Sequence, residues 1–112
     1  MTIIDRLKLE LAHKDYFTDT EFNAFLSENG IDDSSITYDK SVHQLALLTT
    51  VRDILEALSN NIELYMRIQT EFTTVGSAYA NLEKRIDAIE KRIEQLPTYE
   101  PTAKSFSYIY FN

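Results

Sequence analysis

The sequence has no cysteine, and only two glycines and two prolines stand among its 112 residues. Without cysteine the chain can form neither disulfides nor thiolate metal sites, and nothing in it indicates an oxidising compartment. So little glycine and proline leaves few positions for the turns that a many-stranded β fold requires. We therefore expect a mainly helical protein. A chain of this length is long enough for one domain and too short for two.

Sequence motifs of enzyme sites are also missing. The two histidines, His13 and His43, do not stand in a metal-ligand spacing such as HExxH, and there is no glycine-rich phosphate loop or GxSxG turn. The acidic pair Asp32-Asp33 lacks the spacing and the glycine of an EF-hand, so turn formation explains it better than calcium binding. We expect a protein that is not an enzyme and that needs no cofactor and no metal.

The charge is strongly acidic, with a formal net charge of −7, and it is concentrated in the first forty residues, which hold nine acidic and four basic side chains. A negatively charged surface repels phosphate, so tight non-specific binding of nucleic acid is not expected. Such a surface is nevertheless compatible with DNA that moves along it without binding. No stretch approaches the ~18 apolar residues of a membrane span, and residues 1–7 do not resemble a signal peptide. We expect a soluble protein with no membrane partner.

Two short helices are predicted at the start of the chain. Thr2 is placed as the N-cap of a helix that continues to about His13. Thr18 and Glu21 have the spacing of a capping box, which begins a second helix. That helix ends at Gly30, a residue suited to the left-handed position after a helix.

A longer helix is predicted after a loop over residues 31–38. The loop is expected to cap this helix at Asp39 or nearby, and the helical period then runs over residues 40–59. Apolar residues cover much of its circumference, which predicts a buried central helix. The main stripe consists of Val42, Leu45, Leu48, Val51, Ile54, Leu55 and Leu58.

Residues 62–75 carry two competing patterns. Apolar residues alternate with polar ones at Ile62, Leu64, Met66 and Ile68, and Phe72 continues the alternation, which favours a strand. A helical face that includes Tyr65 is the alternative. We interpret the segment as an extended arm or hairpin.

A long final helix is predicted from Ser77 to Leu96, where Pro97 stops it. Its apolar residues step by three and four, as in the seam of a coiled coil, so the helix packs either on its own domain or on another copy of the chain. Because so few heptads are marginal for a free coiled coil, the length favours the first of these. If copies do pack together, the residues expected at their contacts are Leu64, Met66, Ile68, Phe72, Tyr79, Leu82, Ile86, Ile89 and Ile93.

The sequence thus divides into a helical domain, residues 1–96, and an extended tail, residues 97–112. The last eight residues are rich in aromatic and β-branched side chains, which have high strand propensity. They are interpreted as a strand that awaits a partner, and addition to a neighbouring chain is favoured over folding back onto the domain. The predicted partner-binding residues are Phe106, Tyr108, Ile109, Tyr110 and Phe111.

The order of these elements resembles a known family. It is carried by TDTEFNAFLSENG at residues 18–30, DILEALSNN at 53–61 and MRIQTEFTTVGSAYANLEKRI at 66–86, followed by the extended tail. The chain is similar to the small head-tail connector proteins, also called adaptor or head-completion proteins, of tailed double-stranded DNA bacteriophages.

The resemblance implies a small helical bundle of which roughly a dozen copies form a ring. Such a ring lies beneath the portal of the capsid, extends the DNA channel and offers a surface to the next connector or tail protein. The chain would then be a structural protein of the virion neck, made in the host cytoplasm. By the same resemblance, residues 64–75 would contribute to ring contacts, and the final helix and tail would reach the portal or an adjacent subunit.

A second hypothesis needs no ring. The chain could be a small helical adaptor module that docks one soluble protein partner through its aromatic C-terminal motif. Loss of residues 105–112 would then abolish a single binary interaction and leave no assembly affected.

Overall fold

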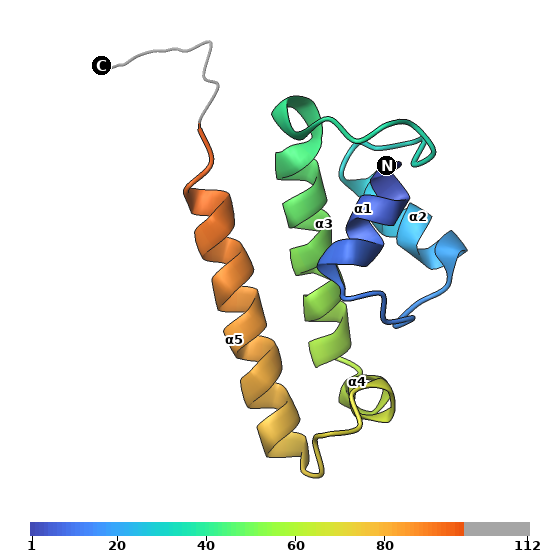
Figure 1. Ribbon diagram of the computed structural model, residues 1–112. Coiled ribbons are helices and arrows are strands. Elements are labelled where there is room, and N and C mark those ends of the chain that lie inside the picture. The colour runs from blue at the N-terminus through green and yellow to red at the C-terminus, as the bar shows by residue number, and fades with distance from the viewer. Residues whose placement is uncertain (98–112) are drawn as a thin grey trace.

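The computed structural model describes residues 1–97, and these form five helices around one apolar core (Figure 1). The expectation of a mainly helical fold is confirmed. Within the described residues the β structure is limited to an isolated antiparallel bridge between Thr2 and Thr37. The helices are α1 (Ile3–Glu10), α2 (Asp19–Glu28), α3 (Lys40–Ser59), α4 (Ile62–Ile68) and α5 (Val75–Glu94).

The central element is α3, which has α5 on one side and α1 and α2 on the other (Figure 1). α5 runs antiparallel to α3, and α4 lies at the turn between them. As predicted, α3 supplies the largest share of the core, because six of its apolar side chains are buried. These are Leu47, Leu48, Val51, Ile54, Leu55 and Leu58.

The predicted N-caps are confirmed. Thr2 Oγ1 accepts a hydrogen bond from the Asp5 N–H at 3.2 Å, and Asp39 caps α3 by accepting from the Ser41 N–H at 3.0 Å. Thr18 and Glu21 form the complete capping box at the start of α2. These local interactions satisfy N–H groups that the helices cannot bond themselves, so they fix the helix starts through neighbouring residues alone.

α1 ends earlier than the sequence predicted, at Glu10 and not near His13. The Ala12 N–H donates to the Leu9 carbonyl at 3.1 Å and the His13 N–H to the Lys8 carbonyl at 2.8 Å, which is the Schellman pattern of helix termination. This closure gives Ala12 a left-handed φ of 56°. The chain therefore uses alanine at a position where glycine is usually found.

The prediction of an extended arm over residues 62–75 is wrong for residues 62–68, which form α4. Seven residues of alternation cannot by themselves exclude a helix, and Leu, Met, Glu and Arg in this segment all favour one. The alternating side chains are only partly buried, whereas Tyr65, which lies outside the alternation, is 1% exposed. The helical conformation thus places Tyr65 in the core, where it contacts Asn81 and Arg85 of α5.

Tyr65 belongs to a polar cluster that joins the segment before α2 to α4 and α5. Its ring stacks on Tyr16 with centroids 5.9 Å apart, and Arg85 Nη1 donates to the hydroxyls of Tyr16 and Tyr65 at 3.2 and 3.1 Å. The Tyr65 hydroxyl donates in turn to Asn81, and Gln69 donates to Tyr16 at 2.7 Å. Burial raises the pKa of Tyr65, so the hydroxyl stays protonated and acts as a structural donor.

We expect Ala12→Gly to stabilise the domain by about 1 kcal/mol. Glycine adopts the left-handed conformation without the penalty that a Cβ atom brings, although it loses more backbone entropy on folding. Urea denaturation followed by circular dichroism measures the difference.

The matched control is Ala24→Gly on the exposed face of α2, which we expect to destabilise the domain by about 1 kcal/mol. Equal destabilisation by both substitutions would contradict the left-handed conformation at Ala12.

Candidate protein-interaction surfaces

Most of the predicted subunit-packing residues lie against the core of their own domain. Leu82 and Ile89 are buried, and six others are partly buried and pack on that core: Leu64, Met66, Ile68, Phe72, Ile86 and Ile93. Tyr79 differs, because it is 39% exposed. The seam of α5 is therefore used to hold α5 on its own chain.

The predicted partner-binding residues Phe106, Tyr108, Ile109, Tyr110 and Phe111 lie outside the described residues, which end at Pro97. What the structure does show is where the chain leaves the domain. It leaves from the end of α5, at the end of the helix pair where α3 begins (Figure 1).

The start of α3 carries an exposed apolar surface, which we call the α3 patch: Val42, 69% exposed, and Leu45, 56% exposed. The prediction that both belong to the buried stripe is wrong. On a helix, positions 42 and 45 lie on the side opposite Leu47 and Val51, which face the core. Because apolar residues occur nearly all round α3, the helical period alone could not decide which side would be buried.

An ion-pair network fixes the end of α5 near this patch. Arg92 donates to both carboxylate oxygens of Glu10 at 2.9 and 3.0 Å, and Arg6 reaches the same carboxylate at 2.9 Å. The guanidinium of Arg6 lies 5.4 Å from the centre of the Tyr38 ring, which packs beside His43 at the start of α3. The network therefore holds α1, the end of α5 and the start of α3 together.

The hydrogen bonds from Arg92 and Arg6 lower the pKa of Glu10, although partial burial acts in the opposite direction. The Glu10 side chain is only 12% exposed. A carboxylate that is little exposed and held by two guanidinium groups stays charged at neutral pH, and its ionised form stabilises the fold.

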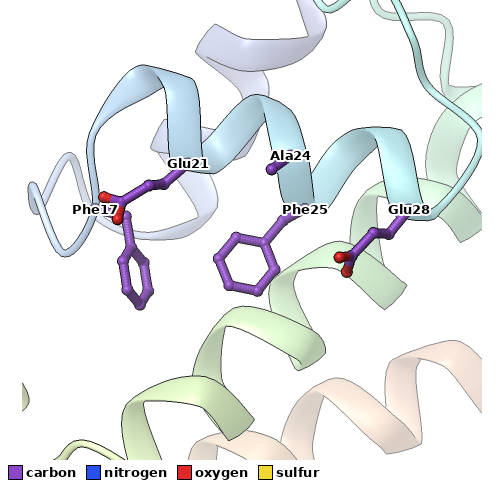
Figure 2. Close-up of a pocket in the computed structure, with 5 residues that line it drawn as sticks. All are labelled: Phe17, Glu21, Ala24, Phe25 and Glu28. Carbon is purple, nitrogen blue, oxygen red and sulfur yellow. The ribbon is translucent and has the colours of Figure 1, made fainter.

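A shallow pocket of about 200 Å³ lies along one flank of α2 (Figure 2). The ring of Phe17, which precedes the helix, lies beside that of Phe25 with centroids 5.4 Å apart, and both rings are partly buried against the core. The Glu21 carboxylate is held at one end by the Thr18 N–H, which donates to it at 2.8 Å. We call this feature the α2 pocket, and its lining residues are Phe17, Glu21, Ala24, Phe25 and Glu28.

The sequence contained a pattern that could have revealed the α2 pocket. Glu21, Ala24 and Glu28 recur at intervals of three or four residues, so they share one side of α2, and Phe17 stands just before the helix. The buried residues of α2, Phe22 and Leu26, occupy another side. What the pattern lacked was the position of α3, which decides which side of α2 is covered.

Residues 1–97 contain neither a metal-ligand cluster nor a membrane-spanning helix. Over this range no three His, Asp or Glu side chains are placed so that they could hold a metal ion together. No helix in the described part of the chain is both long and apolar enough to cross a bilayer. Comparison of the chain with protein-family models, with curated proteins and with solved structures gave no match.

We expect Glu10→Gln to destabilise the domain by about 1–2 kcal/mol at pH 7, because Arg92 and Arg6 lose a charged acceptor. The folded-state pKa of Glu10 lies below its ordinary value of 4.5, so this contribution is complete above that pH and is lost as the pH falls through the folded pKa. The difference between wild type and variant, measured by urea denaturation, should therefore shrink as the pH falls below 4.5.

The control for this experiment is Glu83→Gln, because Glu83 is exposed on α5 and forms no ion pair within residues 1–97. Its effect should be within about 0.5 kcal/mol. A Glu10→Gln effect that is the same at pH 3 and at pH 7 would show that the ionised carboxylate is not the stabilising group.

Proposed function

We propose that this chain is a structural subunit of a phage head-tail connector, which forms a ring between the portal and the tail and surrounds the path of the DNA. The observation that carries the proposal is the α3 patch, an exposed apolar surface at the end of the molecule from which the aromatic tail continues. Neighbouring exposed apolar side chains mark a surface that an assembly can cover, and covering it stabilises the assembly.

The energetic argument concerns Val42 and Leu45. Complete burial of such a side chain contributes roughly 1.5–3 kcal/mol, and both are more than half exposed in the isolated chain. Covering them in an assembly recovers most of this free energy. The surface therefore favours association once a partner of complementary shape is present.

The composition supports the same proposal. A ring around DNA has to let the duplex pass, and an acidic subunit repels phosphate. The aromatic tail adds side chains with strand propensity that can pair with a neighbouring subunit, the portal or the next connector. The sequence resemblance to connector proteins implies a single function that accounts for these features, and it implies the virion neck as the location.

The first test compares the full chain with a version that ends at Glu100. Light scattering over a concentration series, alone and with a candidate portal, gives the mass of the complexes. We expect the full chain to form a large ring or to join the portal, and the shortened chain to do neither, because the aromatic residues of the tail are absent from it. Both versions should have the same unfolding free energy, since the described core ends before residue 98.

Two results would contradict the proposal. If both versions remain monomers and neither joins the portal, the tail is not an assembly element. If the full chain forms only a one-to-one complex with a soluble partner, the docking-module hypothesis replaces the connector.

The second test replaces the α3 patch. Val42→Lys combined with Leu45→Lys should change the unfolding free energy by no more than about 0.5 kcal/mol per site, because the side chains are exposed. It should nevertheless abolish ring formation or portal binding, since two charges would have to be buried.

The control is Val75→Lys, which changes an exposed apolar side chain at the opposite end of α5. It should leave assembly intact. Normal assembly by the double variant would show that the α3 patch is not covered in the complex.

A further inference from the structure

The sequence of α5 contains a short repeat that the packing explains only in part. Residues 82–88 and 89–95 are consecutive heptads, and both contain Glu-Lys-Arg-Ile in their second to fifth positions. The first positions, Leu82 and Ile89, are buried in the core. The repeat places Lys84 and Lys91 one above the other on the outer side of the helix.

The two arginines of the repeat are used within the chain, and the two lysines are not. Arg85 donates to the tyrosine cluster and Arg92 to Glu10. Lys84 and Lys91 are exposed, and neither forms an ion pair with any other residue in the range 1–97. With Ala88, also exposed and lying between them, they make up what we call the α5 lysine stripe.

The α2 pocket complements this stripe in charge and in spacing. Glu21 and Glu28 are seven residues apart on α2, which corresponds to about 10.5 Å along a helix, and Lys84 and Lys91 have the same separation on α5. The small side chain of Ala88, midway between the lysines, leaves space for the two phenylalanine rings of the pocket. A helix that carries this stripe therefore fits the pocket with two pairs of opposite charges.

The two surfaces cannot meet within one molecule. α2 and α5 pack on opposite sides of α3, which separates them (Figure 1). A second copy of the chain can bring its own α5 to the pocket of the first. Because the two surfaces differ, the first copy then keeps a free stripe and the second a free pocket, and such head-to-tail contacts build a ring or an open chain.

We propose that the α2 pocket of one copy receives the α5 lysine stripe of the next copy. The inference deepens the proposed connector function, because it names the contact between neighbouring subunits of the ring. The occupant is a copy of this chain and not an unrelated basic protein, because the stripe matches the pocket in sign, in spacing and in its small central residue.

The absence of natural cysteine makes cross-linking a specific test. In the double variant Ala24→Cys with Ala88→Cys, the two thiols lie at the centres of the pocket and of the stripe, so they approach each other whichever way the two helices run. A short bis-maleimide should join the full-length chains into a ladder of dimers, trimers and larger species. Neither single variant should give more than a dimer, and an equimolar mixture of the two single variants should give the mixed dimer in excess.

The control double variant is Ala24→Cys with Glu83→Cys, in which the second thiol stands on α5 but outside the stripe. It should give at most a weak ladder. A ladder of equal strength from the control, or no ladder from the Ala24 and Ala88 pair, would overturn the proposal. A product that stops at the dimer would overturn the head-to-tail arrangement.

Charge reversal provides the second measurement. Glu28→Lys in the ladder-forming variant should slow cross-linking about fivefold, the effect expected from an exposed ion pair. Adding Lys84→Glu or Lys91→Glu should restore the rate, and the lysine that does so shows whether the helices run antiparallel or parallel. If neither exchange restores the rate, the carboxylate of Glu28 does not pair with the stripe.

The two proposals fail in different ways. If rings or portal complexes form but positions 24 and 88 do not cross-link, the connector function is supported and the proposed contact is wrong. Ladders that form while the full chain builds neither a large ring nor a portal complex would leave the contact standing and remove the connector function.

Discussion

The antiparallel packing of α5 on α3 is the contact on which the rest of the structure depends. A free helix of about twenty residues with one narrow apolar seam is marginal in water, so burial of Leu82 and Ile89 is what makes α5 a stable element. The same packing brings Arg92 to Glu10 and Arg85 to the two tyrosines. The position of every exposed residue on α5 follows from this one contact.

There is a physical reason why the arginines of α5 form contacts within the chain and the lysines are exposed. The planar guanidinium of Arg92 binds both oxygens of Glu10, and that of Arg85 donates to two hydroxyls while it lies near their rings. Lysine offers a compact, strongly hydrated charge that is better kept at the surface. The repeat therefore supplies the fold with arginines and leaves Lys84 and Lys91 exposed at the surface.

The features that were predicted correctly from the sequence are those that depend on local interactions. Capping by Thr2, Thr18 and Asp39 depends on neighbouring residues only, and those helix starts were correct. The turn after α1 was missed because Ala12 takes a conformation typical of glycine. The helical conformation of α4 and the exposure of the α3 patch were not predicted for another reason. In each case the apolar pattern allowed two structures, and contacts with distant helices determine which of them forms. Which side of α2 is left exposed, and with it the α2 pocket, likewise depends on the packing of α2 on α3.

The distribution of charge favours a contact between two different surfaces of two copies over a contact between two identical surfaces. The first forty residues are strongly acidic, whereas α5 carries equal numbers of acidic and basic side chains, and α3 lies between these two regions. A symmetric dimer through two α2 pockets would bring the Glu21 and Glu28 carboxylates of both copies together, which costs free energy through repulsion and loss of hydration. A contact between α2 and the lysine stripe relieves that repulsion. The same charges that oppose a closed symmetric pair thus favour the head-to-tail arrangement that a ring requires.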